Sequence, residues 1–236
     1  MTEELSIAFH GLQYGGAMVY PLVALGMLAT AITIDRSITL CRSTPEPFAL
    51  AGLVEEFGFS WESLERRLET LPRRNAYRRF FAVILVNREN PAWWVESRAE
   101  DEAGEIEKAL GRGLWMLETI VTAAPLMGLL GTITGMMQSF KVIGGSGLVA
   151  PTQVTSGVAQ ALISTALGLA IALLALFAFN FFSRVQSRTL DKMERFGSRM
   201  IDHVRLDQER TSPASAIEEL PDALRLEAAG REKSVL

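Results

Sequence analysis

Charged residues are missing from three long stretches of this 236-residue chain, although they make up 21% of it. No Lys, Arg, Asp or Glu occurs from Leu5 to Ile34, from Thr119 to Phe140 or from Val142 to Ser183. A soluble core rarely needs uncharged runs of this length, whereas each helix that crosses the ~30 Å hydrocarbon layer of a bilayer needs ~20 mostly apolar residues. Three membrane-spanning helices are therefore predicted, rather than buried helices of a large soluble core.

Basic residues are absent before the first apolar run, where Glu3 and Glu4 are the only charged residues. A cleaved signal peptide begins with a basic segment, so the first run is predicted to be a retained helix. Lys and Arg gather instead between the first and second runs and after the third, while the loop between the second and third has only Lys141. Because basic residues favour the cytoplasmic side, the N-terminus is predicted outside and the C-terminus in the cytoplasm.

Cysteine and histidine are too scarce to build a site. Cys41 has no partner for an intrachain disulfide, and His10 and His203 are far apart in sequence, so no metal or cofactor is predicted. The Gly-rich segment 141–157 lacks the spacing of a phosphate-binding loop. Acids and bases interleave outside the apolar runs, which argues against nucleic-acid binding. No catalytic constellation lies within the spans, so the protein is not expected to be an enzyme.

The predicted fold is all-α, with three transmembrane helices and long cytoplasmic helical extensions. A helix is expected to run unbroken from about Trp93 into the second span, and the third helix is expected to continue to about His203. The predicted segments are an external N-terminal segment (1–15), the first span (16–35), a cytoplasmic helical domain (36–114), the second span (115–140), an external loop (141–157), the third span (158–183) and a cytoplasmic tail (184–236).

Small and polar residues recur at helical spacing in the second and third spans. Small residues let helices in lipid approach closely, and six are predicted to pack helix against helix: Gly128, Gly131, Gly135, Gly157, Ala161 and Gly168. Five polar residues lie at or near membrane depth: Thr132, Thr134, Gln160, Ser164 and Thr165. Ser and Thr can bond to their own helix, but Gln160 is costly to bury without a partner. Together they predict a narrow polar path or a docking surface for another polar helix.

Ionisable residues are absent from the middle of every span. A proton relay through a membrane normally needs such a side chain. Glu118 lies near the cytoplasmic end of the second span, where a position at the mouth of a path is expected. If protons cross here, another chain must supply the titrating group.

The apolar spans carry recognisable motifs. The second span reads TAAPLMGLLGTITGMMQSF over 122–140, and the third begins GVAQALISTALGL over 157–169. These two stretches resemble the second and third helices of the MotA/TolQ/ExbB proton-channel family. Tyr20-Pro21-Leu22 and the run from Asp35 to Leu40 are similar to the family's first helix and its exit. Segment 43–110 matches poorly. Three spans favour the ExbB/TolQ branch over the flagellar stator branch.

The resemblance implies a subunit of a motor driven by the proton-motive force in the bacterial inner membrane, with a periplasmic N-terminus. Five copies would surround a dimer of an ExbD- or TolR-like protein, whose single span carries an Asp, and a TonB- or TolA-like protein would join them. The family's pore-facing threonines correspond to Thr132 and Thr165. Many relatives have Glu where this chain has Gln160, which argues against direct proton transfer by Gln160. The alternative is a non-conducting scaffold for a multi-protein envelope complex, and the choice between protons and sodium stays open.

Overall fold

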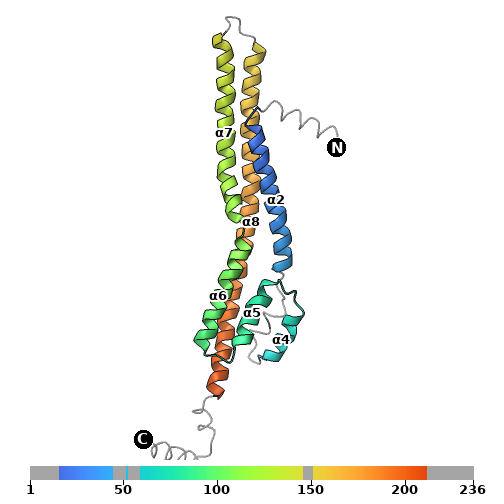
Figure 1. Ribbon diagram of the computed structural model, residues 1–236, viewed down its shortest axis with the longest axis vertical. Coiled ribbons are helices and arrows are strands. Elements are labelled where there is room, and N and C mark those ends of the chain that lie inside the picture. The colour runs from blue at the N-terminus through green and yellow to red at the C-terminus, as the bar shows by residue number, and fades with distance from the viewer. Residues whose placement is uncertain (1–15, 45–51, 53–58, 146–150, 212–236) are drawn as a thin grey trace, which may run out of the picture. The chain divides into compact units, whose positions relative to one another are not determined.

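The computed structural model describes residues 16–44, 52, 59–145 and 151–211. Its helices are α2 (Val19–Ser43), α4 (Trp61–Glu69), α5 (Ala76–Asn87), α6 (Ala92–Gly111), α7 (Leu114–Gly145) and α8 (Pro151–Thr211) (Figure 1). The described residues contain no strand, which confirms the all-α prediction. Three helical stretches are long and apolar enough to cross a membrane, one in each predicted region. The predicted segment 1–15 and the tail beyond Thr211 lie outside the described residues.

The chain divides into two compact units. We call residues 1–41 and 109–187 the membrane unit, and residues 42–108 and 188–236 the extramembrane unit. Helix α8 contributes to both, with its first part in the membrane unit and its last part in the extramembrane unit.

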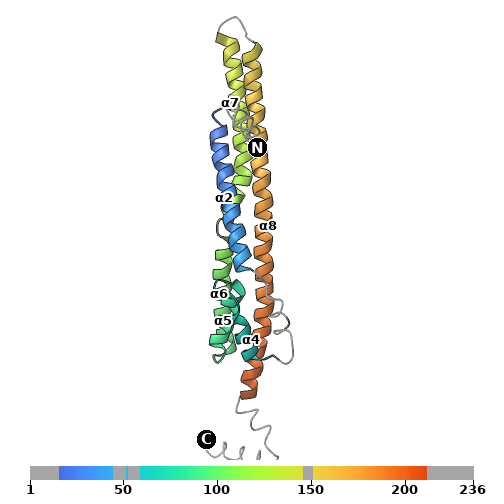
Figure 2. The ribbon, with the colours of Figure 1, turned by 90° about the vertical axis from the view of Figure 1, so that its right-hand side faces the viewer.

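The membrane unit is built on helices α2, α7 and the first part of α8, which lie side by side (Figures 1 and 2). Pairs of facing residues give the directions: Ala124 lies against Gly168, and Gly135 lies against Gly157. Helices α7 and α8 are therefore antiparallel. The core that joins the three helices includes Leu22, Leu117, Ile120, Ile171, Ala175 and Phe182. Pro21 falls in the first turn of α2, where the missing N–H costs no helical bond.

The extramembrane unit packs α4, α5 and α6 with the last part of α8 around a small aromatic core. Phe81 and Phe196 are buried, with 6.1 Å between their ring centroids. Helix α5 is capped by the buried Asn75, whose side-chain oxygen accepts a hydrogen bond from the backbone N–H of Arg78 at 3.2 Å. An ion pair of 2.7 Å between Arg79 and Glu102 ties α5 to α6.

The prediction of an unbroken helix from Trp93 into the second span is wrong, because a short turn separates α6 from α7. Helix α6 ends at Gly111 and α7 starts at Leu114, because Gly113 has φ +83°, a left-handed conformation that no helix interior contains. The segment 141–157, expected to be a loop, is helical up to Gly145 and again from Pro151. Proline is well suited to a first helical position, so it starts α8 here. The third helix passes His203 and ends at Thr211.

Candidate functional site

Glycines let α7 and α8 approach backbone to backbone. A Cβ added to Gly168 would lie 2.6 Å from the carbonyl oxygen of Ala124 on α7, and one added to Gly135 would lie 2.9 Å from the carbonyl oxygen of Gly157 on α8. Real Cβ atoms do not come this close to backbone, so no larger residue fits at either position. Close contact of this kind is how helices gain packing energy in lipid.

All six residues predicted to pack helix against helix lie at this contact. Gly128 and Gly131 face Thr165 and Ser164, and Ala161 lies 3.2 Å from the position of a Cβ on Gly135. Ser164 and Ser139 are fully or almost fully buried in the same contact. The Ser139 hydroxyl has two carbonyl acceptors, Gly135 on its own helix at 3.2 Å and Val154 on α8 at 3.3 Å. These two serines therefore belong to the packed contact and not to an open path.

Thr165 joins the two helices by a hydrogen bond. Its Oγ1 donates to the carbonyl oxygen of Gly128 at 3.3 Å. Thr132 sits one turn along α7 from Gly128, and its Oγ1 donates to the carbonyl oxygen of Leu129 at 2.6 Å. Both threonines are half-buried. A hydroxyl has one hydrogen to donate and two lone pairs that accept. Since each donor is used within the chain, both side chains present only acceptors outward.

The five predicted polar residues do not share one path. Ser164 lies within the α7–α8 contact, and the other four lie on the two flanks of that contact. Helix α2 covers one flank, where Gly26 approaches the side chain of Ile171 and the Gln160 side chain lies against Gly16. At 3.6 residues per turn, Thr165 is about 140° around α8 from Gln160. Thr165 therefore lies on the flank away from α2.

The same split holds on α7. Gly131 faces Met18, the residue before α2, with 3.5 Å between Met18 Cβ and a Cβ added to the glycine. Thr134, one turn later, lies on that flank and donates a hydrogen bond to the carbonyl oxygen of Gly131 at 3.0 Å. Thr132 is about 160° from Thr134 around the helix, toward the flank that carries Thr165. Thr132 and Thr165 thus form one pair, which we call the threonine pair.

Exposed apolar side chains surround the threonine pair. On α7 they are Leu129 and Met136, and on α8 they are Leu162 and Leu169. Glu118 is exposed and lies about 40° around α7 from Thr132, so it shares this flank, roughly 20 Å further down the helix axis. Within the described parts of the membrane-spanning helices, this flank offers hydroxyl groups at depth and a carboxylate only near the end.

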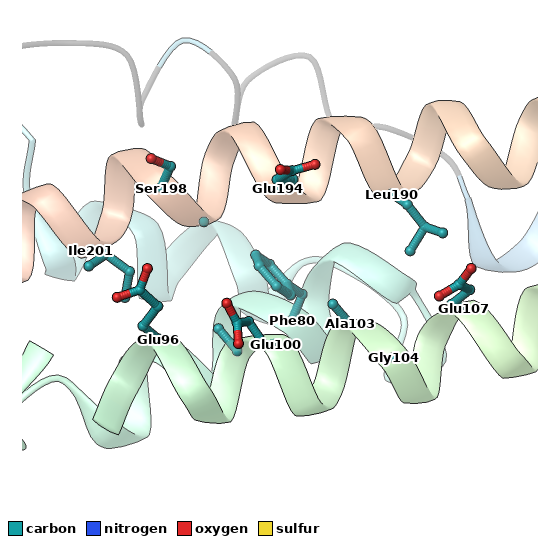
Figure 3. A pocket seen from close by; sticks show the side chains of 12 residues that line it. Phe80, Glu96, Glu100, Ala103, Gly104, Glu107, Leu190, Glu194, Ser198 and Ile201 are labelled. Carbon is teal, nitrogen blue, oxygen red and sulfur yellow. The ribbon is translucent and has the colours of Figure 1, made fainter. Parts of the chain in front are cut away.

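Apart from the threonine pair, a cavity of about 540 Å³ lies within the extramembrane unit between α6 and α8 (Figure 3). Phe80 and Ile201 form apolar parts of its wall, and carboxylates from both helices line it: Glu96, Glu100, Glu107 and Glu194. One of them, Glu96, pairs with Arg205 at 3.3 Å. Among the described residues no group of three or more His, Cys, Asp or Glu side chains could hold a metal ion, this cavity included.

Sequence reasoning missed two glycines that shape the membrane unit. Gly16 has φ +71°, and a Cβ there would overlap the Gln160 side chain. Gly113 breaks the helix before the second span. Neither carries a signal in the sequence, because a positive φ cannot be read from a single glycine.

Comparison with known proteins agrees with this architecture. The family model described as "MotA/TolQ/ExbB proton channel family" matches residues 69–195, more than half of the chain. The chain is 32% identical over 189 residues to "Putative biopolymer transport protein ExbB-like 1" of Synechocystis, covering 79% of the chain and 74% of that protein.

Two further relatives carry the names ExbB and TolQ. "Biopolymer transport protein ExbB" of Xanthomonas campestris is 41% identical over 93 residues, covering 39% of the chain and 37% of that protein. "Tol-Pal system protein TolQ" of Haemophilus influenzae is 29% identical over 174 residues, covering 67% of the chain and 75% of that protein. This multi-pass membrane protein belongs to the MotA/TolQ/ExbB proton channel family.

Proposed function

We propose that the chain is the proton-channel subunit of an inner-membrane motor that uses the proton-motive force to drive outer-membrane transport or an envelope process. The observation that carries the proposal is the threonine pair: two hydroxyl groups on the flank opposite α2, each with its hydrogen already donated to a backbone carbonyl. The relatives named ExbB and TolQ support the transport and envelope roles.

The chemistry of the pair suits an acid that must gain and lose a proton. Acceptor oxygens stabilise a protonated carboxyl group, which donates a hydrogen bond, but give nothing to a carboxylate, which only accepts. A wall of this kind would favour the neutral form of an Asp on the helix of a partner protein, and thereby raise its pKa in the membrane. The Asp would release its proton where the path meets water.

The titrating group is assigned to the partner because the described middle parts of the three spans hold no ionisable side chain. The partner is an ExbD- or TolR-like protein with one membrane helix, which lies against the threonine pair. Several copies of this chain, five by resemblance, enclose the partner. The motor then drives a conformational change in a TonB- or TolA-like protein. One elementary charge moved through 100 mV supplies ~2.3 kcal/mol, so a few protons suffice for a conformational step.

Gln160 has no place in this proton path. Its side chain lies against Gly16 on the flank that α2 covers, about 140° from Thr165. We assign it a packing role at the start of α2. Glu118 is assigned to the mouth of the path, on the cytoplasmic side if the distribution of Lys and Arg sets the orientation.

The proposal is tested by purifying the chain from its native membrane in mild detergent and reconstituting the complex in liposomes. A small single-span protein with a membrane Asp should copurify, and an imposed membrane potential should drive proton uptake into the liposomes. A partner variant with Asn in place of that Asp is the control and should abolish uptake. If the complex assembles but conducts neither protons nor sodium, the scaffold alternative replaces the motor. A sodium flux without a proton flux would change the coupling ion.

A further inference from the structure

A cavity at the end of the membrane unit is distinct from the threonine pair. It has a volume of about 400 Å³ and opens between the last part of α2 and the start of α7. Its lining combines apolar and charged groups: Ala31, Ile32, Asp35, Arg36, Arg112, Gly113, Trp115 and Met116. All of them lie in the membrane unit.

The cavity lies where the apolar surface of the protein gives way to charge. Ile34 on α2 and Trp115 on α7 are large apolar side chains, 55% and 63% exposed, and each lies within three residues of a charged one. Trp is enriched at membrane–water interfaces, where one part of the ring meets acyl chains and the N–H meets headgroups. The apolar wall of the cavity therefore suits acyl chains, and its charged end suits the headgroup layer.

Only part of the charge in the cavity is used within the protein. Arg36 already has partners within the protein: its side chain is 10% exposed and donates hydrogen bonds to Asp35 Oδ2 and to the carbonyl oxygen of Ala109. Asp35 is 63% exposed, and its Oδ2 accepts both hydrogen bonds from Arg36, so none of the described residues occupies its Oδ1. Arg112 is exposed and forms no ion pair with any residue that the structure describes. The cavity thus offers one guanidinium and one carboxylate oxygen to a ligand.

We propose that this cavity binds a membrane phospholipid with a phosphoethanolamine headgroup. The Arg112 guanidinium takes the phosphate by charge-assisted hydrogen bonds, and Asp35 Oδ1 accepts a hydrogen bond from the ammonium group two carbons away. An acyl chain runs along Ile32, Trp115 and Met116. Phosphatidylglycerol shares the phosphate and satisfies Arg112, but it has no ammonium for Asp35. Basic pockets between membrane helices are known to hold lipid headgroups. Here the Asp35 Oδ1 oxygen favours a headgroup that also carries an ammonium group.

The proposal is tested on the full complex in nanodiscs made from an equal mixture of phosphatidylethanolamine and phosphatidylglycerol. After release into the gas phase, native mass spectrometry counts the lipids that stay bound. Phosphatidylethanolamine should be retained in preference. Arg112→Gln should lower its occupancy about tenfold, the loss expected when a charge-assisted hydrogen bond to an ionised group is removed. Arg184→Gln is the matched control, an exposed arginine that borders the uncharged run of α8, and should change nothing.

A second measurement tests the site without changing its charged residues. Phosphatidylethanolamine with brominated acyl chains should quench the fluorescence of Trp115, obtained as the difference between the native protein and Trp115→Phe, more strongly than brominated phosphatidylglycerol does. Soluble phosphoethanolamine and inorganic phosphate should leave this quenching unchanged. Equal retention and equal quenching by the two lipids, occupancy that survives Arg112→Gln, or displacement by soluble phosphate would each overturn the proposal. None of these outcomes bears on the proton path.

Discussion

The Thr165 hydroxyl donates a hydrogen bond to the carbonyl oxygen of Gly128 across 3.3 Å, from α8 to α7. Gly128 is also where the two backbones meet, since a Cβ there would lie 3.0 Å from the carbonyl oxygen of Ser164. One small residue therefore allows the close contact and accepts the bond that directs the Thr165 lone pairs outward. The packing of the helices and the proposed proton chemistry depend on the same contact.

Thr165→Val should strongly reduce proton conduction and leave assembly intact. Valine has nearly the volume of threonine but no lone pairs, so the partner's protonated Asp loses an acceptor. We expect proton uptake by reconstituted liposomes to fall about tenfold or more, the effect of one hydrogen bond to an ionisable group. Thr165→Ser should retain most of the flux. Thr30→Val is the control, because the Thr30 hydroxyl is exposed on α2 and, among the described residues, bonds only to Gly26 of its own helix. Full conduction by Thr165→Val would remove this residue from the mechanism.

Gly168→Ala should weaken the packing of α7 against α8. The added Cβ would lie 2.6 Å from the carbonyl oxygen of Ala124 and 3.1 Å from Gly128 Cα, which are backbone atoms that cannot move aside. Overpacking of this kind costs about 1–3 kcal/mol. The free energy of unfolding is measured by circular dichroism as denaturing detergent is added. Gly104→Ala is the control: a Cβ on Gly104 meets nothing within 4 Å, so the better helix propensity of alanine should raise stability by about 1 kcal/mol. Equal stabilities of the two variants would contradict the close contact.

Residue periodicity was enough to predict the helices and their contact, but not the grouping of the polar residues. Uncharged runs and small residues at i, i+3 and i+7 report the length and packing side of each helix, so the six small residues could be named from the sequence. Their similar depth in the third span predicts that Gln160 and Thr165 line one path. The position of α2, which depends on the long-range contacts of Gly16 and Gly26, separates them.

The break before the second span shows a different limit of sequence reasoning. No proline stands between Trp93 and Pro125, and the Ala- and Glu-rich sequence favours a continuous helix. Gly113 interrupts it with φ +83°. A glycine within a helical pattern costs only about 1 kcal/mol, so its presence alone could not distinguish a tolerated glycine from a helix end.

Glu118→Gln should slow proton uptake by less than Thr165→Val does. Glu118 is exposed on the flank of the threonine pair, and a carboxylate at the mouth of a path raises the local concentration of cations by its field. We expect a loss of a few-fold at low ionic strength, measured as the initial rate of uptake, that shrinks as salt screens the charge. Glu89→Gln, which removes an exposed carboxylate in the turn after α5, should have no effect. A loss as large as that of Thr165→Val, or one that does not depend on salt, would place Glu118 inside the path.

Arg36→Lys should destabilise the connection between α6 and α7. The Arg36 guanidinium bonds Asp35 on its own helix, at 2.6 Å from Nη2, and the carbonyl oxygen of Ala109, at 3.3 Å from Nη1. The rigid fork of arginine reaches both partners at once, whereas the single nitrogen of lysine does not. The Ala109 carbonyl, three residues before the break at Arg112 and Gly113, would lose its bond to a charged donor, at a cost of about 1.5–3 kcal/mol.

The measurement for Arg36→Lys is limited proteolysis of the full complex at a cleavage site engineered next to Gly113, together with its thermal unfolding temperature. Cleavage should be faster in Arg36→Lys than in the native sequence, because local opening of this turn no longer has to break the bond from Arg36. Arg184→Lys, an exposed arginine of the same unit, is the matched control and should be cleaved at the native rate. If Arg36→Lys is also cleaved at the native rate, the turn is held by the packing of Leu114 and Leu117 in the core, and the guanidinium adds nothing to it.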